Sequence, residues 1–237
     1  NFIAPLFVGI LTAIISTSKL VHYLLHSHPE KTWSLFFGLI AASIFIIAKQ
    51  VEAKLYWKNL VGFSLGIMFG FSLVSLIPVV TPDSYFFLLI CGMIAITAMI
   101  LPGISGSFFL VILGKYATVT GALKDLLNLE NFKIVLVFSI GALIGLVSFS
   151  KFLKWLLTEH RAITLSALTG IMLGAMKKIW PWRNILATKT VGTKLVVTSE
   201  RFVFPSELSS HVMLCIILLF VGAALVLLLE KISNSSK

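Results

Sequence analysis

The sequence predicts an all-α polytopic membrane protein built from inverted-topology repeats with re-entrant (broken) helical hairpins. Three observations lead to this fold class: the composition, a helix-breaking motif inside an apolar stretch, and a sequence repeat. Hydrophobic residues make up 58% of the 237 residues and charged residues 12%, with a mean hydropathy of +1.04. Soluble domains carry about 25% charged residues. The composition therefore indicates an integral membrane protein.

The net charge of the chain is +10. In an apolar chain, an excess of Lys and Arg favours contact with anionic lipid headgroups over contact with nucleic acid. We therefore expect the bilayer to be a partner of this protein and expect no nucleic-acid partner.

The helix-breaking motif is Leu-Pro-Gly-Ile-Ser-Gly-Ser at residues 101–107, which we call the break. Asp83 is the only charged residue between Asn59 and Gly114, so the break lies in apolar surroundings. Non-helical backbone at membrane depth is tolerated only where it is buried in protein or lines a polar cavity. The break is therefore the first candidate for a binding site.

Apolar segments predict the helices in chain order. Spans long enough for a hydrocarbon core of about 30 Å, or close to it, are expected at residues 2–25, 33–48, 60–80, 85–100, 132–157, 162–176 and 211–229. The stretch 105–116 suffices only for a half-membrane helix. Residues 85–116 are thus predicted to form either a re-entrant hairpin or two tilted helices with a broken tip. The polar residues 177–210 predict an extramembrane loop, in which the alternation of residues 190–204 favours a small β-hairpin.

Gly62, Gly66 and Gly70 lie four residues apart in the third segment. Small residues at this spacing permit close contact between membrane helices. We expect tight packing there; the alternative is a sliding surface.

Shifting the chain against itself by 132 residues aligns residues 9–38 with residues 141–170, and eleven pairs are identical. The pairs include Lys19/Lys151, His28/His160, Thr32/Thr164, Ser34/Ser166 and Gly38/Gly170. One repeat would contain a broken hairpin and three spans, which is an odd number of crossings. The second copy is then inverted relative to the first, as in many secondary transporters.

Residues 1–80 are accordingly predicted to be the C-terminal part of the first inverted repeat. Residues 81–237 are predicted to be the second repeat, with the re-entrant hairpin at 85–116 and the polar loop at 177–210. The hairpin of the first repeat would precede residue 1, so we expect a longer natural protein with a second Pro-Gly-rich motif upstream.

The break has the composition of an anion site. Its candidate binding residues, which open a helix with free N–H groups, two hydroxyls and a positive helix end, are Pro102, Gly103, Ser105, Gly106 and Ser107. The alternative is a structural kink. The spacing differs from that of a Walker P-loop.

Lys19 and Lys151 occupy equivalent positions of the two repeats and could add positive charge to the same site. The alternative is that both lysines extend to the membrane interface beside Tyr23 and Trp155.

His22, His26 and His28 have a spacing that suggests metal binding, but His26 and His28 would point to different sides. We therefore expect neither a metal site nor a cofactor. The sequence also lacks H-E-x-x-H, G-x-S-x-G with a catalytic triad, and an intramembrane Asp pair. A protein without enzymatic activity is expected.

The break, the following Phe-Phe-Leu-Val-Ile-Leu-Gly-Lys-Tyr, and the Gly-Ala-Leu-Ile-Gly segment that leads to Ser150-Lys151 resemble a known family. It is the prokaryotic family long called domain-of-unknown-function family 368 and now identified with polyprenyl-phosphate transporters. The resemblance covers essentially the whole chain. The family carries the Pro-Gly-x-Ser-Gly element twice, whereas this chain carries only the second copy.

The resemblance implies a multi-pass transporter (flippase) of the prokaryotic cytoplasmic membrane. Its substrate would be undecaprenyl phosphate, a lipid carrier recycled in cell-envelope polymer synthesis, and the break would form half of the headgroup site. This plan is compatible with a coupling ion, either a proton or sodium. Two alternatives remain: a secondary transporter of a small anion, and a membrane enzyme acting on lipid phosphates.

Overall fold

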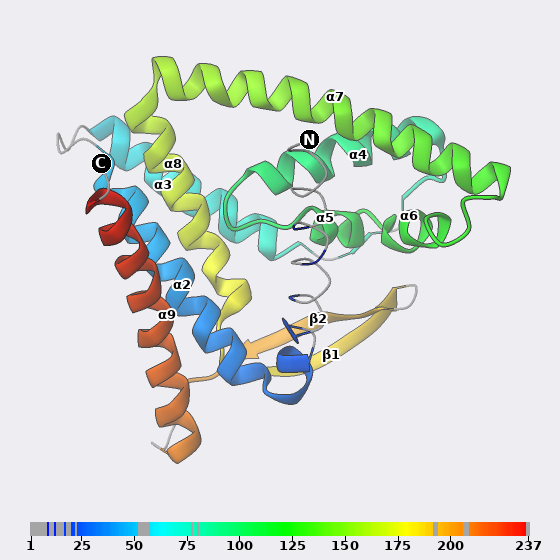
Figure 1. The fold of residues 1–237 in the computed structure, drawn as a ribbon. Helices are drawn as coiled ribbons and strands as arrows, with labels where there is room; N and C mark the ends of the chain where they lie inside the picture. The colour runs from blue at the N-terminus through cyan, green and yellow to red at the C-terminus, as the bar shows by residue number, and fades with distance from the viewer. Residues whose placement is uncertain are drawn as a thin grey trace. The chain divides into compact units, whose positions relative to one another are not determined.

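The computed structural model describes residues 9, 12, 17, 20–21, 23–51, 57–76, 78–79, 81–191, 194–205 and 209–235. The predicted first span, residues 2–25, falls mostly outside them. The described residues form the following elements, drawn in Figure 1: α2 (Pro29–Lys49), α3 (Trp57–Val74), α4 (Tyr85–Ile100), α5 (Gly106–Ile112), α6 (Tyr116–Ala122), α7 (Leu129–Glu159), α8 (Arg161–Ala175), η1 (Met176–Ile179), β1 (Arg183–Val191), β2 (Lys194–Phe202) and α9 (Ser210–Ser235).

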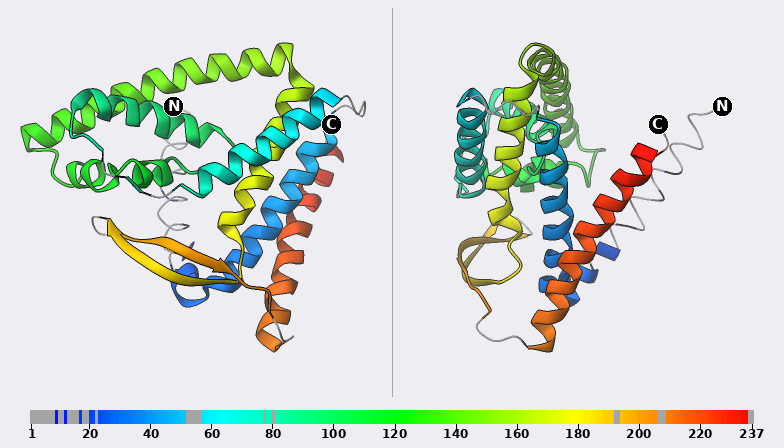
Figure 2. Two further views of the ribbon diagram at one scale, coloured as in Figure 1. Left: turned by 180° about the vertical axis from the view of Figure 1, so that it is seen from behind. Right: turned by 90° about the vertical axis from the view of Figure 1, so that its left-hand side faces the viewer.

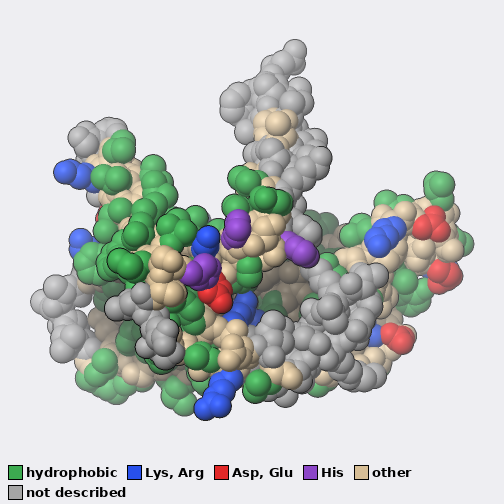
Figure 3. All heavy atoms as spheres, turned by 90° about the horizontal axis from the view of Figure 1, so that it is seen from below, with side chains coloured by type: hydrophobic (Ala, Val, Ile, Leu, Met, Phe, Trp, Pro, Cys, Tyr) green, Lys and Arg blue, Asp and Glu red, His purple; other side chains and the backbone are tan. Residues whose placement is uncertain are grey.

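Among the described residues, five helices are long and apolar enough to cross a membrane. They are α2, α3, α7, α9, and α8 continued by η1. Large hydrophobic side chains are exposed along these helices, and green apolar spheres recur across the face in Figure 3. Such a surface is expected where lipid takes the place of water. The prediction of an all-α polytopic membrane protein is confirmed.

The contacts divide the chain into two compact units. The first comprises Asn1–Ser43, Ile179–Trp182 and Val203–Lys237, and the second comprises Ile44–Lys178 and Arg183–Phe202. These units do not follow the predicted division at residue 80. That division concerns the repeats, and it stays a prediction.

Glycines bring helices into direct backbone contact within each unit. The ribbon of Figure 2 shows these helices from two further directions. In the first unit, a Cβ added to Gly38 of α2 would overlap the carbonyl oxygen of Leu219 of α9. In the second unit, a Cβ on Gly66 of α3 would overlap the carbonyl oxygen of Ala167 of α8. Gly62, Gly66 and Gly70 are the buried residues of α3. The expected tight packing of this glycine stripe is therefore confirmed.

Several of these contacts recur 132 residues apart. Gly170 meets the carbonyl oxygen of Phe63 in the same way as Gly38 meets that of Leu219. The Thr32 hydroxyl donates to the carbonyl oxygens of residues 24 and 28, at 3.1 and 2.8 Å. The Thr164 hydroxyl donates to the carbonyl oxygens of residues 156 and 160, also at 3.1 and 2.8 Å. The spacing of these contacts equals that of the sequence repeat.

The hairpin arms α4 and α5 pack against each other around Cys91, Ala95 and Leu110. The predicted half-membrane helix at residues 105–116 is too long, because α5 ends at Ile112. Gly114 has a φ of +66°, a left-handed conformation that favours glycine and interrupts the helix. A new short helix, α6, starts at Tyr116.

A two-stranded antiparallel sheet occupies most of the polar loop. β1 pairs with β2 from Arg183↔Phe202 to Val191↔Lys194. The predicted β-hairpin is confirmed, but it begins at Arg183, before the expected residues 190–204. The first strand ends in Thr-Lys-Thr-Val, whose β-branched residues suit a strand as well as those of the second strand do.

Candidate phosphate site at the helix break

Local sequence explains the shape of the break. The Ser84 hydroxyl caps the start of α4 by accepting a hydrogen bond from the N–H of Phe87 at 3.2 Å. The helix ends before Leu101, which is extended (φ −73°, ψ 125°), as expected of a residue that precedes proline. Gly103 follows with a φ of +84°, a conformation that glycine adopts without strain. The chain thus turns back within five residues and enters α5.

Two serine hydroxyls lie at this turn. Ser105 and Ser107 are exposed, and their hydroxyls share a hydrogen bond of 2.9 Å. Within the part of the chain that the structure describes, the N–H groups of Ser105, Gly106 and Ser107 donate no hydrogen bond to the protein. Because α5 makes only about two turns, hydroxyls, N–H groups and neighbouring cations have to supply most of the attraction for an anion.

The C-terminal end of α8 lies against the break and brings two lysines with it. A Cβ on Gly103 would be 3.4 Å from the Cα of Met172 in α8. The 3₁₀ turn η1 follows α8 and carries Lys177 and Lys178. The Lys178 ammonium lies 5.8 Å from the ring centroid of Phe108, the residue after the two serines of the break. Positive charge is therefore present near Phe108, the residue that follows the break.

The side chain of Lys177 in η1 contacts the end of the neighbouring helix α3. Its ammonium donates to the Ser75 hydroxyl at 3.0 Å and lies 4.1 Å from the ring centroid of Phe71. Sequence analysis did not single out Lys177 or Lys178 as site residues. The only feature of the sequence that could have indicated these two lysines is their position directly after a predicted span. Their place near the break depends on the packing of α8 against it, which is a tertiary contact.

Of the two lysines that were predicted to add positive charge to the site, only Lys151 is among the described residues. Lys19 lies outside the described residues. Lys151 is exposed on α7, and no hydrogen bond or ion pair joins it to another described residue. Gly141 and Gly145 of α7 lie against Leu89 and Met93 of α4, so the two helices run parallel with a constant offset. No described contact joins Lys151 to the break, so its part in the site stays a prediction.

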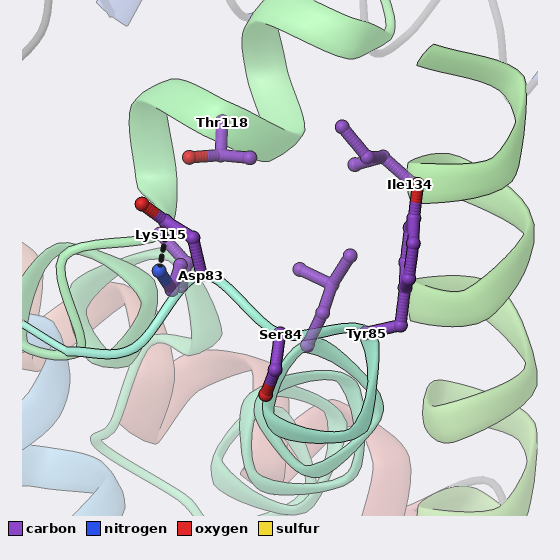
Figure 4. A pocket seen from close by; sticks show the side chains of 7 residues that line it. Asp83, Ser84, Tyr85, Lys115, Thr118 and Ile134 are labelled. Carbon is purple, nitrogen blue, oxygen red and sulfur yellow. Dashed lines mark hydrogen bonds and ion pairs between the residues drawn. The ribbon is translucent and has the colours of Figure 1, made fainter. Parts of the chain in front are cut away.

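A second polar feature lies at the other end of the hairpin. Lys115 is only 4% exposed, forms an ion pair with Asp83, and donates to the carbonyl oxygen of Thr81 at 3.2 Å. Figure 4 shows this pair at the edge of a pocket of about 400 Å³. The pocket is lined by Asp83, Ser84, Tyr85, Leu88, Lys115, Thr118 and Ile134.

The Asp83–Lys115 pair fastens the base of the hairpin. The Thr81 hydroxyl donates to the carbonyl oxygen of Leu113 at 2.6 Å, and the N–H of Val79 donates to that of Ile112 at 2.9 Å. Together these bonds join the segment before α4 to the segment after α5. Asp83 was visible in the sequence as an isolated charge, but its partner could not be identified there.

Removing Asp83 is expected to destabilise the protein more than removing Lys115. In Asp83→Ala the buried ammonium loses its counter-ion, at a cost of about 3 kcal/mol. In Lys115→Met the carboxylate left behind is 90% exposed in the native protein and stays hydrated. Thermal unfolding of both variants in detergent measures the difference. Equal losses, or a larger loss for Lys115→Met, would contradict this role of the pair.

Comparison with known proteins agrees with the resemblance in the sequence. Residues 1–197 match the family model described as undecaprenyl phosphate translocase-like. The chain is 41% identical over 237 residues to a polyprenyl-phosphate transporter of Vibrio cholerae serotype O1, covering 97% of this chain and 75% of the relative. It is 31% identical over 199 residues to a polyprenyl-phosphate transporter of Staphylococcus aureus, covering 76% and 69% respectively. No solved structure matches the chain. The chain belongs to the undecaprenyl phosphate translocase-like family.

Proposed function

We propose that this protein transports undecaprenyl phosphate, a polyprenyl phosphate, across the prokaryotic cytoplasmic membrane, so that the lipid carrier can be reused in cell-envelope polymer synthesis. The observation that carries this proposal is the family match over residues 1–197, together with relatives that are polyprenyl-phosphate transporters. The five apolar helices are in keeping with a multi-pass transporter. The protein acts as a transporter and not as an enzyme.

The break is half of the headgroup site in this proposal. A phosphate monoester is bound best by N–H and hydroxyl donors that are assisted by cations. The break residues are Pro102, Gly103, Ser105, Gly106 and Ser107, and Lys178, which lies near the ring of Phe108, adds positive charge. The isoprenoid tail remains in the lipid. Lys151, and Lys19 in the other repeat, approach the phosphate from α7 and from its counterpart.

Transport in this proposal depends on movement between the two repeats, residues 1–80 and 81–237. The hydrogen bonds of Thr32 and Thr164 and the glycine contacts at the repeat spacing of 132 residues support this division. In inverted-repeat transporters, one repeat moves against the other around a fixed site near the midplane. The hairpin at 85–116 meets its upstream counterpart there, the loop 177–210 stays outside the membrane, and a proton or sodium ion drives the cycle.

Reconstitution of the full-length protein in liposomes tests the substrate. Polyprenyl phosphate is supplied in one leaflet, and its arrival in the other leaflet is followed over time. We expect the lipid to move, and we expect no uptake of inorganic phosphate into the same liposomes. Uptake of inorganic phosphate without lipid movement would assign the protein to the small-anion transporters instead.

A further inference from the structure

Three potential metal ligands from two helices meet in the first unit. Glu30 lies in the first turn of α2, and His211 and Cys215 lie at the start of α9. Residues four apart share one face of a helix, so the imidazole and the thiol of α9 are presented to the same neighbour.

The distances fit a tetrahedral metal site. The Nδ1 atom of His211 lies 3.4 Å from Oε2 of Glu30, and the three ligand atoms all lie within 4.8 Å of one another. Zinc binds nitrogen and oxygen at about 2.0–2.1 Å and sulfur at about 2.3 Å. Two ligands of a tetrahedron with those bond lengths are about 3.3–3.6 Å apart. The carboxylate and the imidazole already have this separation, and a shift of about 1 Å by the Cys215 side chain completes the set.

The surrounding packing holds the ligands in place. Gly38 of α2 contacts the backbone of Leu219, and Gly222 of α9 contacts the backbone of Leu35, so the two helices are locked at close range. Cys215 is fully buried at 0% exposure, whereas the side chains of His211 and Glu30 are about half exposed. A metal ion could therefore enter from the solvent side and keep a water molecule as its fourth ligand.

We propose that Glu30, His211 and Cys215 bind a divalent transition metal of the zinc class. Thiolate and imidazole ligands favour zinc and its neighbours over magnesium or calcium. Binding displaces the thiol proton of Cys215 into solvent. The ion ties the start of α2 to the start of α9 and restrains any movement between these helices.

The expectation of no metal rests on His22, His26 and His28. His26 and His28 do not belong to the cluster, and His22 lies outside the described residues. Glu30 is far from His211 along the chain, so no sequence spacing could have indicated their meeting.

Cobalt titration of the full-length, chelator-treated protein in detergent tests the proposal. Co²⁺ reports its ligands directly, because a thiolate ligand adds a near-ultraviolet charge-transfer band to the visible bands of a tetrahedral site. We expect saturable binding of one ion per chain, with displacement by Zn²⁺. Cys215→Ser should remove the charge-transfer band, and Glu30→Gln and His211→Gln should each weaken binding by more than about 10-fold.

Two matched variants serve as controls. Cys91 is likewise a fully buried thiol in a helix, and His160 likewise starts a helix next to a turn, but neither belongs to the cluster. Cys91→Ser and His160→Gln should therefore keep the full cobalt spectrum. If the wild type shows no saturable binding, or if Cys91→Ser removes the band as Cys215→Ser does, the proposal is wrong. Glu30 and His211 then only contact each other, with 3.4 Å between Oε2 and Nδ1.

Discussion

Gly38→Ala and Gly170→Ala are each expected to destabilise the protein by about 1–3 kcal/mol, although alanine is the better helix former. The added Cβ of each variant overlaps a carbonyl oxygen of the neighbouring helix, at Leu219 for Gly38 and at Phe63 for Gly170. A backbone atom cannot rotate away as a side chain can, so the helix pair has to separate. Thermal unfolding in detergent measures the loss.

The matched control is Gly121→Ala in α6, because a Cβ there meets no atom within 4 Å. That variant should keep or slightly raise the unfolding temperature, since alanine gains about 1 kcal/mol over glycine in a helix. Because Gly38 and Gly170 occupy equivalent positions of the two repeats, Gly38→Ala and Gly170→Ala should have similar effects. A neutral result for either one, beside a destabilising result for the other, would contradict the equivalence of the two helix pairs.

Removing both hydroxyls of the break should reduce lipid transport strongly. A hydrogen bond to a charged group contributes about 1.5–3 kcal/mol, and each 1.4 kcal/mol is tenfold in affinity. The variant Ser105→Ala with Ser107→Ala is therefore expected to lower transport by at least about 10-fold. Both side chains are exposed, so their removal should leave the unfolding temperature unchanged. Initial rates in proteoliposomes measure the effect.

Ser43→Ala is the control for the hydroxyls. The Ser43 hydroxyl donates to the carbonyl oxygen of Leu39 within α2 and is not part of the break, so its loss should not alter transport. Lys178→Met and Lys151→Met should also slow transport, whereas Lys154→Met, one turn along α7 from Lys151, should not. If Lys151→Met matches Lys154→Met, then Lys151 only extends to the membrane interface.

The features that sequence alone predicted correctly are those encoded locally. The glycine stripe of α3 indicated close packing because its four-residue spacing defines one face of a helix, and that face is buried. Pro102 and Gly103 placed the end of α4 correctly, because the proline restricts the residue before it and the glycine permits a positive φ.

The features that sequence missed depend on tertiary contacts. The helix after the break is shorter than expected because Gly114 sits in a left-handed conformation close to the backbone of Val79, from the segment before α4. Lys178 lies near Phe108 because the end of α8 packs on Gly103. The partner of the isolated Asp83 is Lys115, which lies across the base of the hairpin. None of these contacts has a signature in spacing or composition.

We propose that the break binds the phosphate of the lipid carrier. The most direct test is the rate at which polyprenyl phosphate moves between leaflets in liposomes that contain full-length protein. We predict rapid movement with the wild type and a strongly reduced rate when Ser105→Ala is combined with Lys151→Ala in a protein of unchanged unfolding temperature. Transport at the wild-type rate by that double variant would contradict the assignment of the headgroup site.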